Sequence, residues 1–179
     1  RTRSPVGLMP GGERVREAVF SRLGAEVQGA RVLELFAGSG ALGLEALSRG
    51  ARSVVLVERD RRAAATIEAN IAALGVAEEA RCLRCDAVRA VGVLARRGEV
   101  FDLVLADPPY EESAGLRRES PLGRAVTGLA AAGCLAEGAL VVVEHRWEPE
   151  PAFGWPGFEV EASRTYGDTR VTYLRYRPG

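Results

Sequence analysis

The chain has 179 residues, which suffices for one α/β domain with a sizeable buried core. Its 24 basic and 24 acidic residues balance to a formal net charge of zero, so charge alone does not indicate a nucleic-acid partner. No apolar run is long enough to span a bilayer or resembles a secretion signal. We expect a single cytoplasmic domain over residues 1–179, without a membrane partner.

The first residues differ in composition from the rest of the chain. Glycine and proline recur through residues 1–12, which predicts an irregular N-terminal arm, and the start at Arg1 rather than Met suggests that this arm is truncated. Apolar residues then recur at helical spacing from Val15 to Leu23. This spacing predicts a helix over Glu13–Leu23.

Short apolar strands and helices alternate through the middle of the chain. The predicted strands are Arg31–Phe36, Ser53–Val57, Ala80–Cys85, Phe101–Ala106 and Ala139–Glu144. The predicted helices are Ala41–Arg49, Arg61–Leu74, Val88–Arg97 and Arg124–Ala132. This alternation is typical of a parallel sheet with right-handed crossovers.

The C-terminal part breaks this alternation. Two strand-like segments, Phe158–Thr165 and Arg170–Arg177, flank a turn. They predict an antiparallel hairpin at the sheet edge. The expected fold class is therefore Rossmann-like α/β, with a mostly parallel seven-stranded sheet, a C-terminal hairpin and helices on both faces.

A glycine-rich turn follows the first predicted strand and reads Gly38-Ser39-Gly40-Ala41-Leu42-Gly43. Gly38 and Gly40 would let the backbone turn tightly and approach a ligand closely. The same pattern occurs in NAD-binding proteins, where the following helix receives a pyrophosphate. The turn alone therefore leaves the cofactor open.

Acidic residues at the strand ends narrow the choice, because ligands of open α/β sheets bind beyond the carboxyl ends of the strands. Glu34 could receive a methionine ammonium, Glu58 the two ribose hydroxyls, and Asp86 the adenine amino group beside the Ala87 backbone. This set fits S-adenosylmethionine. The alternatives are solvated charges at strand ends for Glu58 and Asp86, and a helix-capping or ion-paired acid for Glu34.

The tetrapeptide Asp107-Pro108-Pro109-Tyr110 follows the fourth predicted strand. An exocyclic amino group of a base is a poor nucleophile, and two hydrogen-bond acceptors would favour its attack on a methyl group. The carboxylate of Asp107 and the carbonyl of Pro108 could serve, while Tyr110 could stack on the base. A simple turn is the alternative. Methyl transfer needs no metal, and Cys82, Cys85 and His145 are too few ligands for a zinc site.

These motifs carry a family resemblance. The helix ERVREAVF, the block LELFAGSGALGLEALSRGA, the tetrapeptide DPPY and the ending YGDTRVTYLR resemble the bacterial 16S ribosomal RNA guanine-N2 methyltransferases of the RsmD type. The resemblance covers nearly the whole chain. It implies a class I methyltransferase fold, S-adenosyl-L-methionine as cofactor with S-adenosyl-L-homocysteine as product, and a guanine of 16S ribosomal RNA as target, free or in an assembling small-subunit particle.

The resemblance also assigns roles by position. It implies cofactor contacts at Glu34, Gly38, Glu58 and Asp86, contacts to the target amino group at Asp107, Pro108 and Tyr110, and cofactor-side or RNA-side roles at Arg14, Arg16 and Glu17. A solvated, ion-paired helix face is the alternative for the last three. The family usually carries a longer basic arm, and its shortening here could shift RNA binding to arginines such as Arg117 and Arg118.

Other functions stay open at this point. An adenine-N6 methyltransferase acting on RNA or DNA would use the same acceptors, so the tetrapeptide does not name the base. A nicotinamide-dependent oxidoreductase is a distant alternative, and so is a non-catalytic binding module. The segment Glu111–Ser120 follows the tetrapeptide directly, where a substrate lid would lie.

Overall fold

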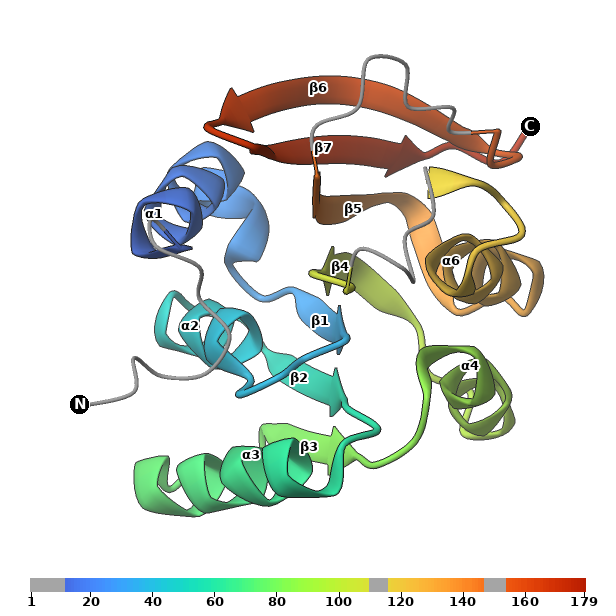
Figure 1. Cartoon of the computed structure of the whole chain (residues 1–179). Helices are drawn as coiled ribbons and strands as arrows, with labels where there is room; N and C mark the ends of the chain where they lie inside the picture. The colour runs from blue at the N-terminus through green and yellow to red at the C-terminus, as the bar shows by residue number, and fades with distance from the viewer. Residues whose placement is uncertain (1–11, 110–115, 147–153) are drawn as a thin grey trace.

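A seven-stranded sheet forms the centre of the protein, in the order β3-β2-β1-β4-β5-β7-β6 (Figure 1). The computed structural model describes residues 12–109, 116–146 and 154–179. Strands β1 to β5 run parallel, and the hairpin β6–β7 joins β5 in antiparallel fashion. The strands are β1 (Arg31–Leu35), β2 (Ser53–Val57), β3 (Ala80–Leu83), β4 (Phe101–Ala106), β5 (Leu135–Arg146), β6 (Phe158–Tyr166) and β7 (Thr169–Tyr176). The predicted fold class is confirmed.

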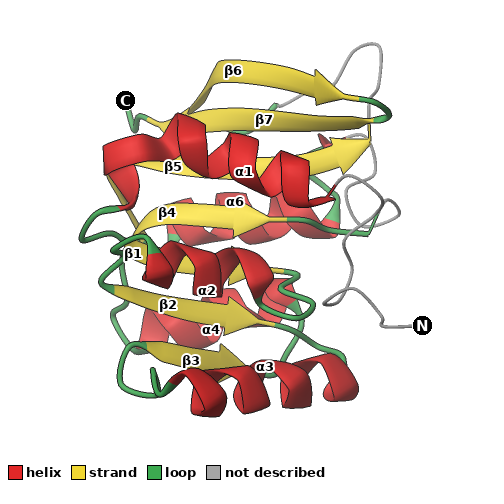
Figure 2. Ribbon diagram, turned by 90° about the vertical axis from the view of Figure 1, so that its left-hand side faces the viewer, coloured by secondary structure: helices red, strands yellow, loops and turns green. Residues whose placement is uncertain are grey.

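Helices cover both faces of the sheet. Helices α1, α2 and α3 lie on one face, and α4 and α6 lie on the other (Figures 1 and 2). Their bounds are α1 (Gly12–Leu23), α2 (Ala41–Ser48), α3 (Arg61–Leu74), α4 (Ala87–Arg96) and α6 (Pro121–Ala131). A short 3₁₀ helix, η1 (Gly24–Val27), follows α1 and was not predicted.

The central strands are buried on both faces, as their continuous apolar runs predict. On β4, Leu103 and Leu105 pack in the core beneath α1, α2 and α3, whereas Val104 and Ala106 pack in the core beneath α4 and α6. Successive side chains of a strand point to opposite faces, so one strand supplies both cores.

Several element ends differ from the prediction. Helix α6 begins at Pro121 rather than Arg124, because the Ser120 hydroxyl accepts the Gly123 N–H at 3.0 Å and proline suits the first helical turn. Strand β1 ends at Leu35, since Phe36 adopts a left-handed conformation with φ of 55°. Gly12 lies in α1 rather than in the N-terminal arm. Residues 1–11 lie outside the described part of the chain.

The ends of strands β3 and β5 also differ from the prediction. Strand β3 stops at Leu83, because the Cys85 N–H turns back to the Leu83 carbonyl at 3.1 Å. Strand β5 is longer than predicted and spans Leu135–Arg146, with a register shift against β4 between Phe101 and Leu103. The remaining predicted elements agree within a residue at their ends.

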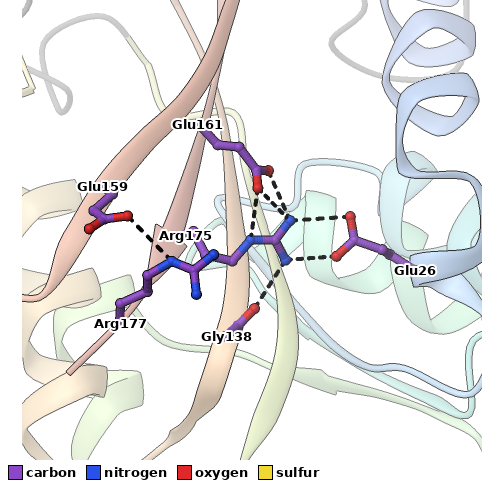
Figure 3. Close-up of polar contacts among 6 residues, drawn as sticks. All are labelled: Glu26, Gly138, Glu159, Glu161, Arg175 and Arg177. Carbon is purple, nitrogen blue, oxygen red and sulfur yellow. Dashed lines mark hydrogen bonds and ion pairs between the residues drawn. The ribbon is translucent and has the colours of Figure 1, made fainter.

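Arg175 of β7 ties the C-terminal hairpin to the rest of the fold (Figure 3). Its guanidinium donates to Glu26 of η1 at 2.7 Å, to Glu161 of β6 at 2.8 Å and to the Gly138 carbonyl of β5 at 3.0 Å. The carboxylates hold the pKa of Arg175 above its ordinary value. One side chain therefore links η1, β5, β6 and β7.

Candidate active site

A cavity of about 360 Å³ opens at the carboxyl ends of the parallel strands. This is the edge at which open α/β sheets bind their ligands. The predicted site residues that line it are Arg16, Glu34, Gly38, Glu58, Asp86, Ala87, Asp107 and Pro108. The structure thus brings the acids after β2 and β3 and the first residues of the tetrapeptide after β4, Asp107 and Pro108, into one space.

Glu34 lies at the floor of this cavity and is 2% exposed. Its Oε1 accepts the N–H of Gly43 at 2.9 Å, in the first turn of α2. Burial raises the pKa of Glu34 to about 8, the charges of Asp107 and Glu58 add to this, and the bond from Gly43 opposes it. Glu34 thus caps helix α2, which was one of the alternatives for this residue. Its second carboxylate oxygen takes no part in this bond.

The glycine turn serves this arrangement. Gly40 has φ of 80° and precedes α2, and a Cβ there would lie 2.7 Å from the Leu56 side chain. Gly40 does not line the cavity, so the structure gives it a packing role. Glu34 takes up a backbone N–H at the start of α2 that a pyrophosphate would need, which disfavours a dinucleotide cofactor.

Glu58 and Asp86 are held by backbone donors. Glu58 accepts the Gly38 N–H at 2.8 Å and the Asp60 N–H at 2.7 Å, so its carboxylate fixes both the glycine turn and the start of the next loop. Asp86 caps α4 by accepting the Arg89 N–H at 2.9 Å. Each carboxylate oxygen has a further lone pair, so both groups can still accept from a ligand.

Asp107 has an acidic neighbour that the sequence reading missed. The last aligned pair of β4 and β5 is Ala106 and Val143, and Asp107 and Glu144 follow on the two strands. Both carboxyl groups line the cavity. Burial, and then the charge of Glu144, raises the pKa of Asp107 to about 8, and burial also raises the pKa of Glu144.

Glu144 could have been found in the sequence. It is the last residue of the predicted strand Ala139–Glu144, close to the position after a strand that singled out Glu58, Asp86 and Asp107, although in the structure β5 continues to Arg146. His145, which follows it, also lines the cavity. It is 3% exposed, its Nε2 lies 2.7 Å from the Thr172 hydroxyl, and burial lowers its pKa. No sequence pattern indicated that this histidine would be buried.

The remaining predicted residues lie elsewhere. Arg14, Glu17, Arg117 and Arg118 are exposed and do not line the cavity. Tyr110 lies outside the described residues, and so do residues 111–115 of the predicted lid segment Glu111–Ser120. Within residues 12–109, 116–146 and 154–179, no group of His, Cys, Asp and Glu side chains could hold a metal ion. None of the described helices is long and apolar enough to cross a membrane.

Comparison with known proteins gives a consistent result. Residues 2–175 match the family described as "Conserved hypothetical protein 95". YlbH of Bacillus subtilis (strain 168), named as a candidate rRNA methyltransferase, is 34% identical over 168 residues, which cover 94% of this chain and 88% of that protein. Ribosomal RNA small subunit methyltransferase D of Escherichia coli (strain K12) is 39% identical over 142 residues, which cover 79% of this chain and 66% of that protein.

A solved structure points the same way. The yhhF protein of Escherichia coli, named as a candidate methyltransferase, matches with a TM-score of 0.82 and 32% identity, covering 97% of this chain and 90% of that one. Family match, sequence relatives and solved structure thus agree over most of the chain. The chain belongs to the "Conserved hypothetical protein 95" family, the RsmD family of rRNA methyltransferases.

Proposed function

We propose that this protein transfers a methyl group from S-adenosyl-L-methionine to the exocyclic N2 amino group of a guanine in 16S ribosomal RNA. The observation that carries the proposal is the shared cavity: Asp107 and Pro108 open into the same space as Glu58 and Asp86. An amino group held at the first pair would face a nucleoside held at the second. The RNA is free or part of an assembling small-subunit particle, and the protein acts in the cytoplasm.

The charge of the cavity fits this cofactor. Its acidic lining residues are Glu34, Glu58, Asp86, Asp107 and Glu144, and its arginines are Arg16 and Arg59. Acids therefore outnumber bases, and a ligand that carries an ammonium and a sulfonium group would offset this excess. S-adenosyl-L-homocysteine, the product, retains the ammonium group.

Each group of the cofactor has a matching partner in the chain. Glu58 would accept the ribose hydroxyls, and its two backbone bonds hold its carboxylate in place for them. Asp86 and the backbone of Ala87 would hold the adenine. Glu34 would receive the ammonium through the oxygen that does not bond Gly43.

The chemistry follows from the tetrapeptide. The cofactor supplies an activated methyl group bonded to positively charged sulfur. Asp107 and the Pro108 carbonyl would accept the two N–H bonds of the target amino group, which concentrates the lone pair on nitrogen and aims it into the cavity. Pro108 is buried, so its carbonyl is held rigidly. Arg16 of α1 lines the cavity and would contact the RNA.

The test uses 16S rRNA from cells that lack this gene, both free and in small-subunit particles, with labelled S-adenosylmethionine and the purified protein. Mass spectrometry of the digested RNA should find labelled N2-methylguanosine. Labelled N6-methyladenosine would instead establish the adenine alternative, and unlabelled RNA would reject the proposal. Asp107→Ala serves as the control: it should bind the cofactor, as calorimetry measures, without transferring the methyl group.

A further inference from the structure

Asp107 directly follows β4, and Glu144 lies beside it on the neighbouring parallel strand β5, two residues before that strand ends. They directly follow the aligned pair Ala106 and Val143. Side chains alternate along a strand, so both residues point to the face of Leu105 and Val142, which pack in the core under α1, α2 and α3. Both also line the cavity. Two carboxyl groups therefore share one partly buried space.

Two adjacent carboxyl groups removed from water do not both ionise readily, because their negative charges repel and each loses hydration. We infer that Glu144 is a positioning residue that helps to keep a proton on Asp107 until the methyl donor enters the cavity, so that Asp107 becomes an ionised carboxylate, which only accepts hydrogen bonds, when the positively charged cofactor is present. This inference rests on the proposed function, because it requires the sulfonium group to lie within reach of the amino group that Asp107 holds.

The surrounding charges are consistent with a single shared proton. The charged and titratable side chains that line the same cavity are Arg16 from α1, Glu34 from β1, Glu58 and Arg59 after β2, Cys85 and Asp86 after β3, and His145 from β5. Burial lowers the pKa of His145, so it is neutral beside the pair at pH 7. The pKa of Asp107, raised to about 8, places its proton in the physiological range.

The proton on Asp107 also accounts for the proton that methyl transfer releases from the target nitrogen. During transfer the bond between sulfur and the methyl carbon breaks, its electron pair stays on sulfur, and the nitrogen lone pair forms the new N–C bond. The positive charge moves to nitrogen, which becomes strongly acidic, and Asp107 takes its proton. The protonated pair is the resting state again. Asp107 gives this proton to solvent when the next cofactor enters, so each turnover releases one proton.

The experiment measures protons released on cofactor binding, by titration calorimetry in buffers of different ionisation enthalpy. At pH 7, S-adenosylmethionine should release about one proton more than S-adenosylhomocysteine, which lacks the sulfonium charge. Because both ligands carry the same ammonium group, any contribution from Glu34 cancels in this comparison. Equal release by the two ligands would overturn the inference.

Variants at position 144 sharpen the result. Glu144→Gln removes the charge but keeps the size, so the pKa of Asp107 should fall and the difference between the two ligands should shrink, whereas burial of Asp107 acts in both proteins. Glu144→Asp keeps the charge and should preserve the difference. A difference in Glu144→Gln that equals the wild-type difference contradicts the role of Glu144. Thermal melting of each variant verifies that the fold is intact.

The inference and the proposed function fail in different ways. Binding calorimetry needs no RNA, so a wrong target base leaves the proton release unchanged and appears only as unlabelled guanine in the rRNA assay. A wrong inference appears as equal proton release alongside normal labelling of guanine. Together the two assays therefore show whether a negative result contradicts the inference about Glu144 or the proposed function.

Discussion

Glu34 reaches from β1 to the first turn of α2, where its Oε1 accepts the N–H of Gly43 at 2.9 Å. Helix α2 begins after Gly40, which has no side chain to cap it, so this buried carboxyl takes the place of a capping residue. A Cβ on Gly43 would lie 3.0 Å from the same oxygen. The glycine turn and the acid in β1 are therefore one structural unit.

Two substitutions at Glu34 separate its structural role from its proposed ligand role. Glu34→Gln keeps an oxygen for the Gly43 N–H but loses the charge, so the melting temperature should stay near wild type while cofactor affinity falls about tenfold. Glu34→Ala leaves the N–H buried without a partner, and should lower the free energy of unfolding by about 1–3 kcal/mol. Calorimetry and denaturant unfolding measure the two effects. If Glu34→Gln binds the cofactor like wild type, the ammonium contact is wrong.

The pH dependence of stability follows from the same residue. In the unfolded chain the pKa of Glu34 should lie near its ordinary value of 4.5, whereas burial raises it to about 8 in the folded protein. The folded state therefore binds the proton more tightly, and the stability that this proton contributes is fully present below pH 4.5 and lost as the pH rises through 8. The slope can reach about 1.4 kcal/mol per pH unit for one such group.

The measurement is urea unfolding of the cofactor-free protein between pH 5 and 8. Wild-type stability should fall across this window, and Glu34→Gln should flatten the slope. Asp107 and Glu144 act in the same direction, since their pKa values are also raised. Asp102, whose pKa Arg31 lowers, titrates below the window and does not interfere. A slope that is identical in Glu34→Gln contradicts the prediction.

Glu58 should dominate affinity for the nucleoside. Glu58→Ala removes both proposed ribose contacts and frees the Gly38 and Asp60 N–H groups, so the dissociation constant for the cofactor should rise more than tenfold, or about 1.4 kcal/mol. Glu68→Ala, an exposed acid on α3 outside the cavity, is the matched control and should leave it unchanged. An unchanged constant in Glu58→Ala rules out the ribose contact.

The fold could be predicted from the sequence because its signals are local. The run Val54–Val57 is apolar throughout, as a strand buried on both faces requires, and α3 has both a capping Asp60 and a terminating Gly75 with φ of 67°. The predicted ends of helices and strands were wrong where a single contact sets the end of the element. Nothing in the composition of β1 reveals that Phe36 turns left-handed. The start of α6 was missed although Ser120 followed by Pro121 is a helix-start signal ahead of its periodic residues.

The site was predictable in part for the same reason. Position after a strand placed Glu58, Asp86 and Asp107 at one sheet edge, and the structure brings them to one cavity. Their ligand contacts remain predictions. The pairing of Asp107 with Glu144 depends on which strands become neighbours, and β4 and β5 are aligned by the sheet rather than by any local pattern. Gly40 was assigned to the ligand, whereas its contact with Leu56 depends on tertiary packing.

The C-terminal hairpin offers a prediction that does not involve the cavity. Arg175 and Arg177 lie two residues apart, and each forms an ion pair with a glutamate of β6, Glu161 and Glu159 respectively (Figure 3). The Arg175 side chain is 15% exposed, whereas Arg177 is 59% exposed and its partner Glu159 is 70% exposed. Burial distinguishes the two pairs, because exposed ion pairs contribute little to stability.

Arg175→Ala should therefore lower the free energy of unfolding by about 1–3 kcal/mol, since it removes bonds to η1, β5 and β6 together. Arg177→Ala should change it by less than about 0.5 kcal/mol. Denaturant unfolding of both variants makes the comparison, with cofactor binding as a check that the cavity is intact. Equal effects of the two substitutions would show that Arg175 is not what ties the hairpin to the sheet.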